Sequence, residues 1–179
     1  MEEELRALLS RTALGDRDAF KALYQATSPQ ILGLLIHMLG QRDRAEDALQ
    51  DTYIKVWHRA RDYHAERGQV NTWLASIARY RALDLLRADK TRQQRASRAK
   101  PELATEDELP DALAQSQSDN GRLYDCLHQL NDRQRQSIGL AFFRGFTHEE
   151  LAAQLDAPLG TVKAWIRRGL QQLRLCLEE

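Results

Sequence analysis

The sequence contains few residues that break helices or cross-link a chain: nine glycines, four prolines and two cysteines in 179 residues. No apolar run approaches the roughly 20 residues that a membrane helix requires, and the N-terminal stretch MEEELRALLSR is acidic and amphipathic. We therefore expect neither a signal peptide nor a transit peptide nor insertion into a membrane. The protein is predicted to be cytoplasmic.

Residue patterns that hold metals or cofactors are also missing. Cys126 and Cys176 lie far apart, without CxxC or paired-histidine spacing, so both are predicted to be ordinary thiols, part-buried on helices. The five histidines are equally scattered and are interpreted as structural or surface residues. No glycine-rich phosphate loop and no nucleophile beside a base is recognisable. The sequence therefore predicts no metal, no cofactor and no catalytic residue.

The net charge is zero, with 26 basic and 26 acidic residues, but the charges are unevenly distributed. Basic residues dominate positions 87–100, whereas positions 101–120 carry acidic residues and no basic one. Positions 159–174 carry four basic residues and no acidic one. Local patches, rather than the total, set the field that a phosphate backbone meets. A neutral chain is therefore compatible with a nucleic-acid partner.

Apolar residues recur with the helical period, and no stretch alternates strictly enough to predict a strand, so we expect an all-α protein. Helices are predicted in the first half near residues 3–14, 19–25, 29–38, 44–60 and 72–87. Asp16 or Asp18 is expected to cap the second of these helices, and Asp43 the fourth. Pro29 is expected in the first turn of the third, where its missing N–H costs nothing.

The second half predicts four helices, at residues 121–129, 132–143, 147–155 and 158–177. Asn131 or Asp132 is expected to cap the second, and Thr147 with Glu150 forms a capping box for the third. Helical periodicity disappears between the two halves, where polar residues dominate. We therefore predict two small helical domains, residues 1–88 and 119–179, joined by a flexible linker at 89–118.

The strongest local pattern lies between Phe146 and Arg174: a short helix, a tight connection and a longer basic helix, which is helix-turn-helix spacing. Gly160 is expected to let the backbone pass close to its neighbour or to a phosphate. One side of the longer helix is apolar and is expected to pack inward: Val162, Ile166, Gly169, Leu170 and Leu173. The other side is left outside: Thr161, Lys163, Ala164, Arg167, Arg168 and Arg174. Such a helix can enter the major groove of DNA, with its first residues at base edges and its basic residues on phosphates.

Three segments resemble a known family. DRAEDALQDTYIKVW (residues 43–57) is similar to region 2.2 of extracytoplasmic-function sigma factors, and GQVNTWLASIARYRALDLLR (68–87) to their regions 2.3 and 2.4. The segment from Leu130 to Arg174 is similar to their region 4. The resemblance implies a non-enzymatic subunit that binds core RNA polymerase and directs it to promoter DNA.

The resemblance also implies roles for particular residues. Outward residues of the region 2.2 helix would bind the polymerase: Asp47, Gln50, Asp51, Ile54 and Lys55. Residues of regions 2.3 and 2.4 would melt the minus-ten element and hold a flipped base: Tyr63, Asn71, Trp73, Arg79, Tyr80 and Arg81. Residues of the basic helix would read the minus-thirty-five element: Thr161, Lys163, Ala164, Trp165, Arg167 and Arg168.

Several of these roles have a simpler alternative. Asp47 and Asp51, the acidic residues among those expected to bind the polymerase, would also suit a solvated helix face. Trp73 would also suit the hydrophobic core. Members of the family commonly have Ser-Arg where this chain has Ala164-Trp165, so Trp165 either stacks on DNA or packs inward. The acidic half of the linker either imitates a nucleic-acid backbone in the polymerase channel or serves as a solubilising spacer.

The resemblance also implies an inhibitory partner, and one other class of protein explains part of the sequence. The family is usually held inactive by an anti-sigma factor, often membrane-anchored, and we expect such a partner here. An ordinary helix-turn-helix regulator would explain the C-terminal half equally well, but it leaves residues 43–87 unexplained.

Overall fold

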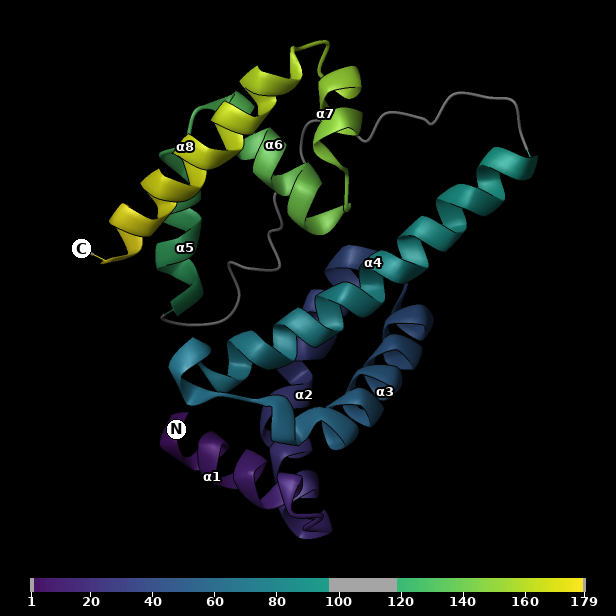
Figure 1. Ribbon diagram of the computed structural model, residues 1–179, viewed down its shortest axis with the longest axis vertical. Helices are drawn as coiled ribbons and strands as arrows, with labels where there is room; N and C mark the ends of the chain where they lie inside the picture. The colour runs from purple at the N-terminus through teal and green to yellow at the C-terminus, as the bar shows by residue number, and fades with distance from the viewer. Residues whose placement is uncertain (1, 97–118, 179) are drawn as a thin grey trace. The chain divides into compact units, whose positions relative to one another are not determined.

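The computed structural model of the protein describes residues 2–96 and 119–178, and every regular element in these ranges is a helix (Figure 1). This confirms the all-α prediction. Contacts divide the chain into two compact units, Met1–Asp89 and Lys90–Glu179. Most of the predicted linker, residues 97–118 with their acidic run, lies outside the described residues.

The N-terminal unit is built from four α-helices and two short 3₁₀ helices, purple to teal in Figure 1. Helix α2 packs against both α1 and α3. Leucine, alanine and isoleucine side chains of all four helices form its core. The elements are α1 (Glu2–Ala13), α2 (Arg17–Leu39), α3 (Arg42–Arg59), η1 (Ala60–Asp62), η2 (Ala65–Arg67) and α4 (Val70–Ala96).

Helix α2 is continuous where the sequence predicted two helices, so the predicted break before Pro29 is wrong. Asp16 caps the helix as expected, because its carboxylate accepts hydrogen bonds from the backbone N–H groups of Asp18 and Ala19. Pro29 lies inside the helix, where it costs a backbone hydrogen bond. A stripe of buried residues runs across this point on both sides and stabilises the helical path: Leu23, Thr27, Ile31 and Leu35.

Two other helix ends differ from the sequence prediction. Helix α3 has Gln41 at its N-cap without a side-chain cap, so Asp43 does not cap it and lies in its first turn instead. There its carboxylate is well placed toward the positive end of the helix dipole. Helix α4 continues past Arg87 to Ala96 and takes in the first residues of the predicted linker.

A buried polar contact joins α2 to α3. The Thr27 hydroxyl donates to the Leu23 carbonyl at 2.7 Å and lies 2.6 Å from the Tyr53 hydroxyl. Since the single proton of Thr27 goes to that carbonyl, Tyr53 is the donor between the two hydroxyls. Burial raises the pKa of Tyr53 to about 12. The edges of the Phe20 and Tyr24 rings complete an aromatic cluster around Tyr53.

The C-terminal unit is built around its last helix, which contacts the other three. Its elements are α5 (Asp119–His128), α6 (Asp132–Phe143), α7 (His148–Gln154) and α8 (Leu159–Glu178). Asn131 caps α6 and Thr147 caps α7, each in a complete capping box with the glutamine or glutamate three residues later. The capping box predicted at Thr147 is therefore confirmed.

The prediction of two ordinary thiols is wrong, because Cys126 of α5 and Cys176 of α8 form a disulfide. Cys126 is 1% exposed and belongs to a small core with Leu127, Leu130 and Leu173. The disulfide joins residues 50 positions apart, so it closes a loop that contains α6 and α7. Sequence spacing alone could not indicate this pairing, because it arises from the side-by-side packing of α5 and α8.

The glycine that tight packing requires is Gly169. The close approach of Gly160 to a neighbouring part of the chain, one of its two predicted roles, is wrong, and its closeness to a phosphate stays a prediction. A Cβ atom built on Gly160 meets nothing within 4 Å. A Cβ atom on Gly169 would lie 2.6 Å from Ile138 Cδ1 and 3.2 Å from Gln134 Cβ, so α6 and α8 approach each other there. Leu170, predicted to face inward, is 52% exposed.

Candidate nucleic-acid interface

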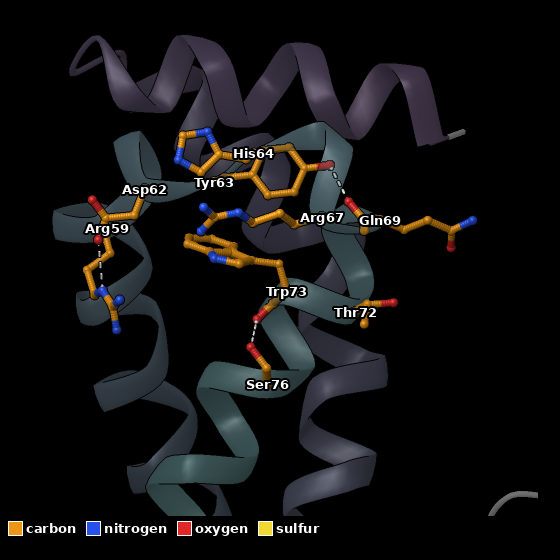
Figure 2. A pocket seen from close by; sticks show the side chains of 10 residues that line it. Arg59, Asp62, Tyr63, His64, Arg67, Gln69, Thr72, Trp73 and Ser76 are labelled. Atoms are coloured by element: carbon orange, nitrogen blue, oxygen red, sulfur yellow. Dashed lines mark hydrogen bonds and ion pairs between the residues drawn. The ribbon is translucent and has the colours of Figure 1, made fainter. Parts of the chain in front are cut away.

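A pocket of about 350 Å³ lies in the N-terminal unit, where α3 ends and α4 begins (Figure 2). This volume is within the range of about 300–1,000 Å³ that is typical of ligand sites. The end of α3, the two 3₁₀ turns and the first turns of α4 all contribute to its wall. The lining residues are Arg59, Asp62, Tyr63, His64, Arg67, Gly68, Gln69, Thr72, Trp73 and Ser76.

Hydrogen bonds and ring contacts hold this wall in shape. The Tyr63 hydroxyl donates to the Gly68 carbonyl at 2.9 Å, and the rings of Tyr63 and Trp73 meet edge to face with centroids 5.7 Å apart. Gly68 has a φ of 145°, a conformation that a residue with a side chain rarely adopts. The backbone N–H of Val70, at the start of α4, donates to the Glu2 carboxylate at 2.9 Å. The loop is therefore anchored both to itself and to α1.

The pocket combines aromatic surface with positive charge. In Figure 2 Tyr63, His64, Arg67 and Trp73 gather around its centre, whereas the Gln69 side chain points away to one side. Trp73 is half-buried, so part of its ring faces the pocket. Aromatic faces stack on nucleobases, and guanidinium groups bind phosphates. This arrangement suits an unpaired nucleotide.

The structure brings only some of the residues predicted for the minus-ten element into this pocket. Tyr63 and Trp73 line it, but Asn71 does not. Asn71 is half-buried, and its amide oxygen is shielded from solvent without a hydrogen-bond partner among the described residues.

The other three residues of that set follow farther along α4. Tyr80 is 63% exposed, which is unusual for an aromatic side chain on a helix of a folded unit. Arg79 is half-buried, and burial lowers the pKa of its guanidinium. Arg81 is half-buried as well and is paired with Asp51 of α3 through two of its nitrogen atoms, at 2.8 and 2.7 Å.

Most polar residues of the pocket were missed by sequence reasoning. Eight of its lining residues were not predicted as site residues: Arg59, Asp62, His64, Arg67, Gly68, Gln69, Thr72 and Ser76. All but Arg59, Thr72 and Ser76 fall in the polar connection between two predicted helices. Loops that carry many charged residues next to an aromatic residue are a usable signal for such a site.

Helix α3 presents the residues predicted to bind the polymerase on its outer surface. Asp47, Gln50, Ile54 and Lys55 are exposed. Ile54 is 57% exposed, although it is apolar. Asp51 is half-buried because of its ion pair with Arg81.

The helix-turn-helix of the C-terminal unit is formed by α7 and α8. The connection turns at Asp156, which has a φ of 47°, and the N–H of Ala157 donates to the Ala152 carbonyl at 3.0 Å. Val162, Gly169 and Leu173 of α8 are buried, while Leu151 of α7 is fully covered. Helix α8 contacts α7, but its buried side is shared with other helices, because Gly169 approaches α6 and Leu173 belongs to the small core around Cys126.

The six residues predicted to read the minus-thirty-five element lie on the remaining surface of α8. Lys163, Arg167 and Arg168 are exposed, whereas Thr161, Ala164 and Trp165 are half-buried. The guanidinium of Arg133, from α6, lies over the Trp165 ring at 5.8 Å from its centroid. Trp165 therefore neither points freely outward nor disappears into the core.

The described parts of the chain contain neither a metal-binding cluster nor a membrane-spanning helix. Residues 2–96 and 119–178 contain no group of three or more His, Cys, Asp or Glu side chains placed to hold a metal ion. None of the helices in these ranges is long and apolar enough to cross a membrane.

Comparison with known families assigns both units. The Sigma-70 region 2 family matches residues 23–92, and the Sigma-70, region 4 family matches residues 126–175. The ECF RNA polymerase sigma factor SigK of Mycobacterium ulcerans is 37% identical, over 98% of this chain and 95% of its own. SigK of Mycobacterium tuberculosis is 33% identical, over 99% and 96%. Rhodobacter sphaeroides SigE, solved in complex with the anti-sigma ChrR, is 32% identical, with a TM-score of 0.47 over 100% of this chain and 99% of its own.

Proposed function

The chain belongs to the ECF sigma factors of RNA polymerase, and we propose that it binds core RNA polymerase and directs it to a specific class of promoters. It acts as a non-enzymatic initiation factor. The observation that carries this proposal is the pairing, in one chain, of a Sigma-70 region 2 unit with an aromatic and basic pocket and a region 4 unit with a basic helix. In this proposal residues 1–88 and 119–179 are the two working domains, and residues 89–118 connect them.

The C-terminal unit binds the minus-thirty-five element in duplex form. The first turns of α8 enter the major groove, where Thr161, Lys163 and Ala164 face base edges. Exposed Arg167 and Arg168 bind phosphates, because guanidinium groups form charge-assisted hydrogen bonds with them. Trp165 lies at the margin of this surface, where its ring supports Arg133.

The N-terminal unit opens the minus-ten element and captures an unpaired base. Unstacking a base costs a few kcal/mol. Stacking on an aromatic side chain contributes about 1–3 kcal/mol per base. Because one such contact does not offset the cost of unstacking, capture of the base has to use more than one contact. Tyr63 and Trp73 supply stacking surface in the pocket, and Tyr80 supplies it on α4.

Positive charge around this pocket binds the backbone of the open strand. Arg79 and Arg81 lie beside Tyr80 on α4, and Asn71 lies at the start of the same helix. We assign Asn71 a contact to DNA from its place at the start of α4, between pocket residues Gln69 and Thr72.

The outer surface of α3 docks on the polymerase. It combines the exposed acid Asp47 with Gln50, Lys55 and the apolar Ile54. A single exposed isoleucine is common on protein surfaces, so the proposal rests on the family assignment together with the exposure of these residues. Asp51 flanks this surface.

An anti-sigma factor completes the proposed set of partners. Solved sigma factors were crystallised with such proteins, among them Rhodobacter sphaeroides SigE with the anti-sigma ChrR and the sigma factor RpoE with the anti-sigma factor NepR from Bartonella quintana. We infer that this chain is also controlled by an anti-sigma factor, and that it acts in the cytoplasm, where core polymerase and DNA are found.

Reconstituted transcription with purified core polymerase and a library of promoters tests the function. We expect transcripts from a subset of promoters that share two short elements. Arg167→Ala should weaken duplex binding at the upstream element and reduce the salt slope of binding by about one. Asn71→Ala should change base preference in the downstream element. The matched control for Arg167→Ala is Arg122→Ala, which also removes one positive charge, from an exposed position on α5.

A different outcome would reject the proposal. A chain that fails to associate with core polymerase, yet recognises a duplex operator alone, is an ordinary helix-turn-helix regulator. Unchanged promoter selection by both variants would reject the residue assignments and leave the function standing.

A further inference from the structure

An ion pair joins the two functional surfaces of the N-terminal unit. Asp51 comes from α3, the helix whose outer surface carries Asp47, Gln50 and Ile54. Arg81 comes from α4 and directly follows the exposed Tyr80. Their side chains meet through the Arg81 Nε atom at 2.8 Å and a terminal nitrogen at 2.7 Å, both on the same carboxylate oxygen.

While this pair is closed, the Arg81 guanidinium is held at the Asp51 carboxylate. The Asp51 carboxylate uses one oxygen for two Arg81 nitrogens, and its side chain is 43% exposed. The Arg81 side chain is 29% exposed, so the pair lies at the rim of the unit and not in its core. A basic group that approached α3 would compete with Arg81 for Asp51, and a phosphate that approached α4 would compete with Asp51 for Arg81.

Separating Asp51 from Arg81 also requires little free energy. An ion pair that reaches solvent on both sides contributes little to stability, because water screens both charges. Opening it leaves no buried charge behind, since both groups already reach solvent. A competing charge on a docked macromolecule can therefore replace one partner without unfolding the unit.

We propose that the Asp51–Arg81 pair makes DNA binding by the N-terminal unit depend on polymerase binding. In the free chain Asp51 holds Arg81 against α3 and away from phosphates. When a basic side chain of the docked polymerase takes over the Asp51 carboxylate, Arg81 is released to the backbone of the open strand. Asp51 is thus a positioning residue for Arg81, and the coupling rests on the function proposed above.

Because of thermodynamic linkage, this coupling predicts a change in DNA affinity and a change in polymerase affinity. Asp51→Asn should mimic the docked state, because an amide binds guanidinium weakly, and the free variant should bind DNA more tightly than the wild type. Arg81→Ala should leave Asp51 unpaired, so the variant should bind core polymerase more tightly than the wild type. A pair that serves only stability would produce neither gain.

The experiment uses the full chain and a fluorescein-labelled single-stranded DNA dodecamer of mixed sequence, read by anisotropy. Asp51→Asn should lower the dissociation constant about three- to tenfold and steepen its salt dependence by about 0.7, the value for one added contact to single-stranded phosphate. In the presence of saturating core polymerase, the wild type and Asp51→Asn should differ less than in its absence.

Removing any acidic residue strengthens DNA binding to some extent, so a matched control is required. Asp89→Asn removes the same charge from a second ion pair, Arg44–Asp89, that joins the same two helices. It should produce a clearly smaller gain. In the Arg81→Ala background the gain from Asp51→Asn should vanish, because the arginine to be released is absent.

Equal gains from Asp51→Asn and Asp89→Asn, or a full gain in the Arg81→Ala background, would overturn the coupling. If wild-type protein still bound core polymerase and supported transcription in that case, the proposed function would stand without it. Failure of wild-type protein to bind core polymerase would reject the proposed function itself.

Discussion

Breaking the Cys126–Cys176 disulfide should selectively destabilise the C-terminal unit. The bond closes a loop between residues 50 positions apart. The chain-entropy relation for a loop of that length gives about 14 cal/mol/K, or about 4 kcal/mol at 25 °C, as the stabilisation from constraining the unfolded chain. A unit of roughly 60 residues has a total stability of about 3–9 kcal/mol, so the loss is a large fraction of it.

Hydrogen exchange read by mass spectrometry is the assay, because it follows both units in one sample. After reduction, or in the Cys176→Ser variant, peptides from α6 and α8 should exchange much faster. Peptides from α2 and α3 serve as the internal control and should be unaffected. Substituting Cys176, which is only half-buried, leaves the 1%-exposed Cys126 in place and avoids a polar group in the core.

Two results would refute this reasoning. If thiol titration of the unreduced protein found both cysteines reactive in the folded state, the bond would be absent. If the bond were present but reduction left exchange in α6 and α8 unchanged, the loop-entropy argument would fail for this unit.

Three further outcomes are expected. Gly169→Ala should destabilise the C-terminal unit by about 1–3 kcal/mol in urea unfolding, because the new Cβ would lie 2.6 Å from Ile138 Cδ1. Gly139→Ala, where a Cβ meets nothing within 4 Å, should be neutral or stabilising, and equal losses at both glycines would contradict the packing argument. Burial raises the pKa of Tyr53 to about 12, so the stability that this difference contributes is complete below about pH 10 and is lost as pH rises toward 12. Tyr53→Phe should lose that alkaline dependence, and an unchanged pH profile of unfolding would contradict it. Thr147→Ala should cost about 1 kcal/mol through loss of the α7 cap, measured by urea unfolding against the wild type, and no loss would mean that the capping box is not formed in solution.

Several features that depend on residues close together in the chain were predictable from the sequence, although the cap predicted at Asp43 was wrong. The capping box at Thr147 and the cap at Asp16 use groups within three residues of each other, so local pattern predicts them. The helical period also predicts which side of α8 is buried at Val162 and Leu173. The candidate residues on the outer surface of α3 follow from the same period.

The local sequence pattern did not predict the structure where tertiary packing opposes the local preference of a residue. Pro29 predicts a helix boundary, but packing of α2 on α1 and α3 stabilises one continuous helix through it. Gly160 and Gly169 look alike in sequence, and only the close approach of α6 distinguishes them.

Contacts between residues far apart in the sequence depend on the tertiary structure alone. Cys126 meets Cys176 because α5 and α8 pack together. Asp51 of α3 meets Arg81 of α4 although the two residues lie 30 positions apart in the chain. The pocket beside Trp73 likewise needs the end of α3 and the start of α4 to converge. Sequence determines which side chains are available and on which face of a helix they lie. Which of them meet depends on helix packing, since burial of apolar surface has no direction and only the assembled core sets the partners.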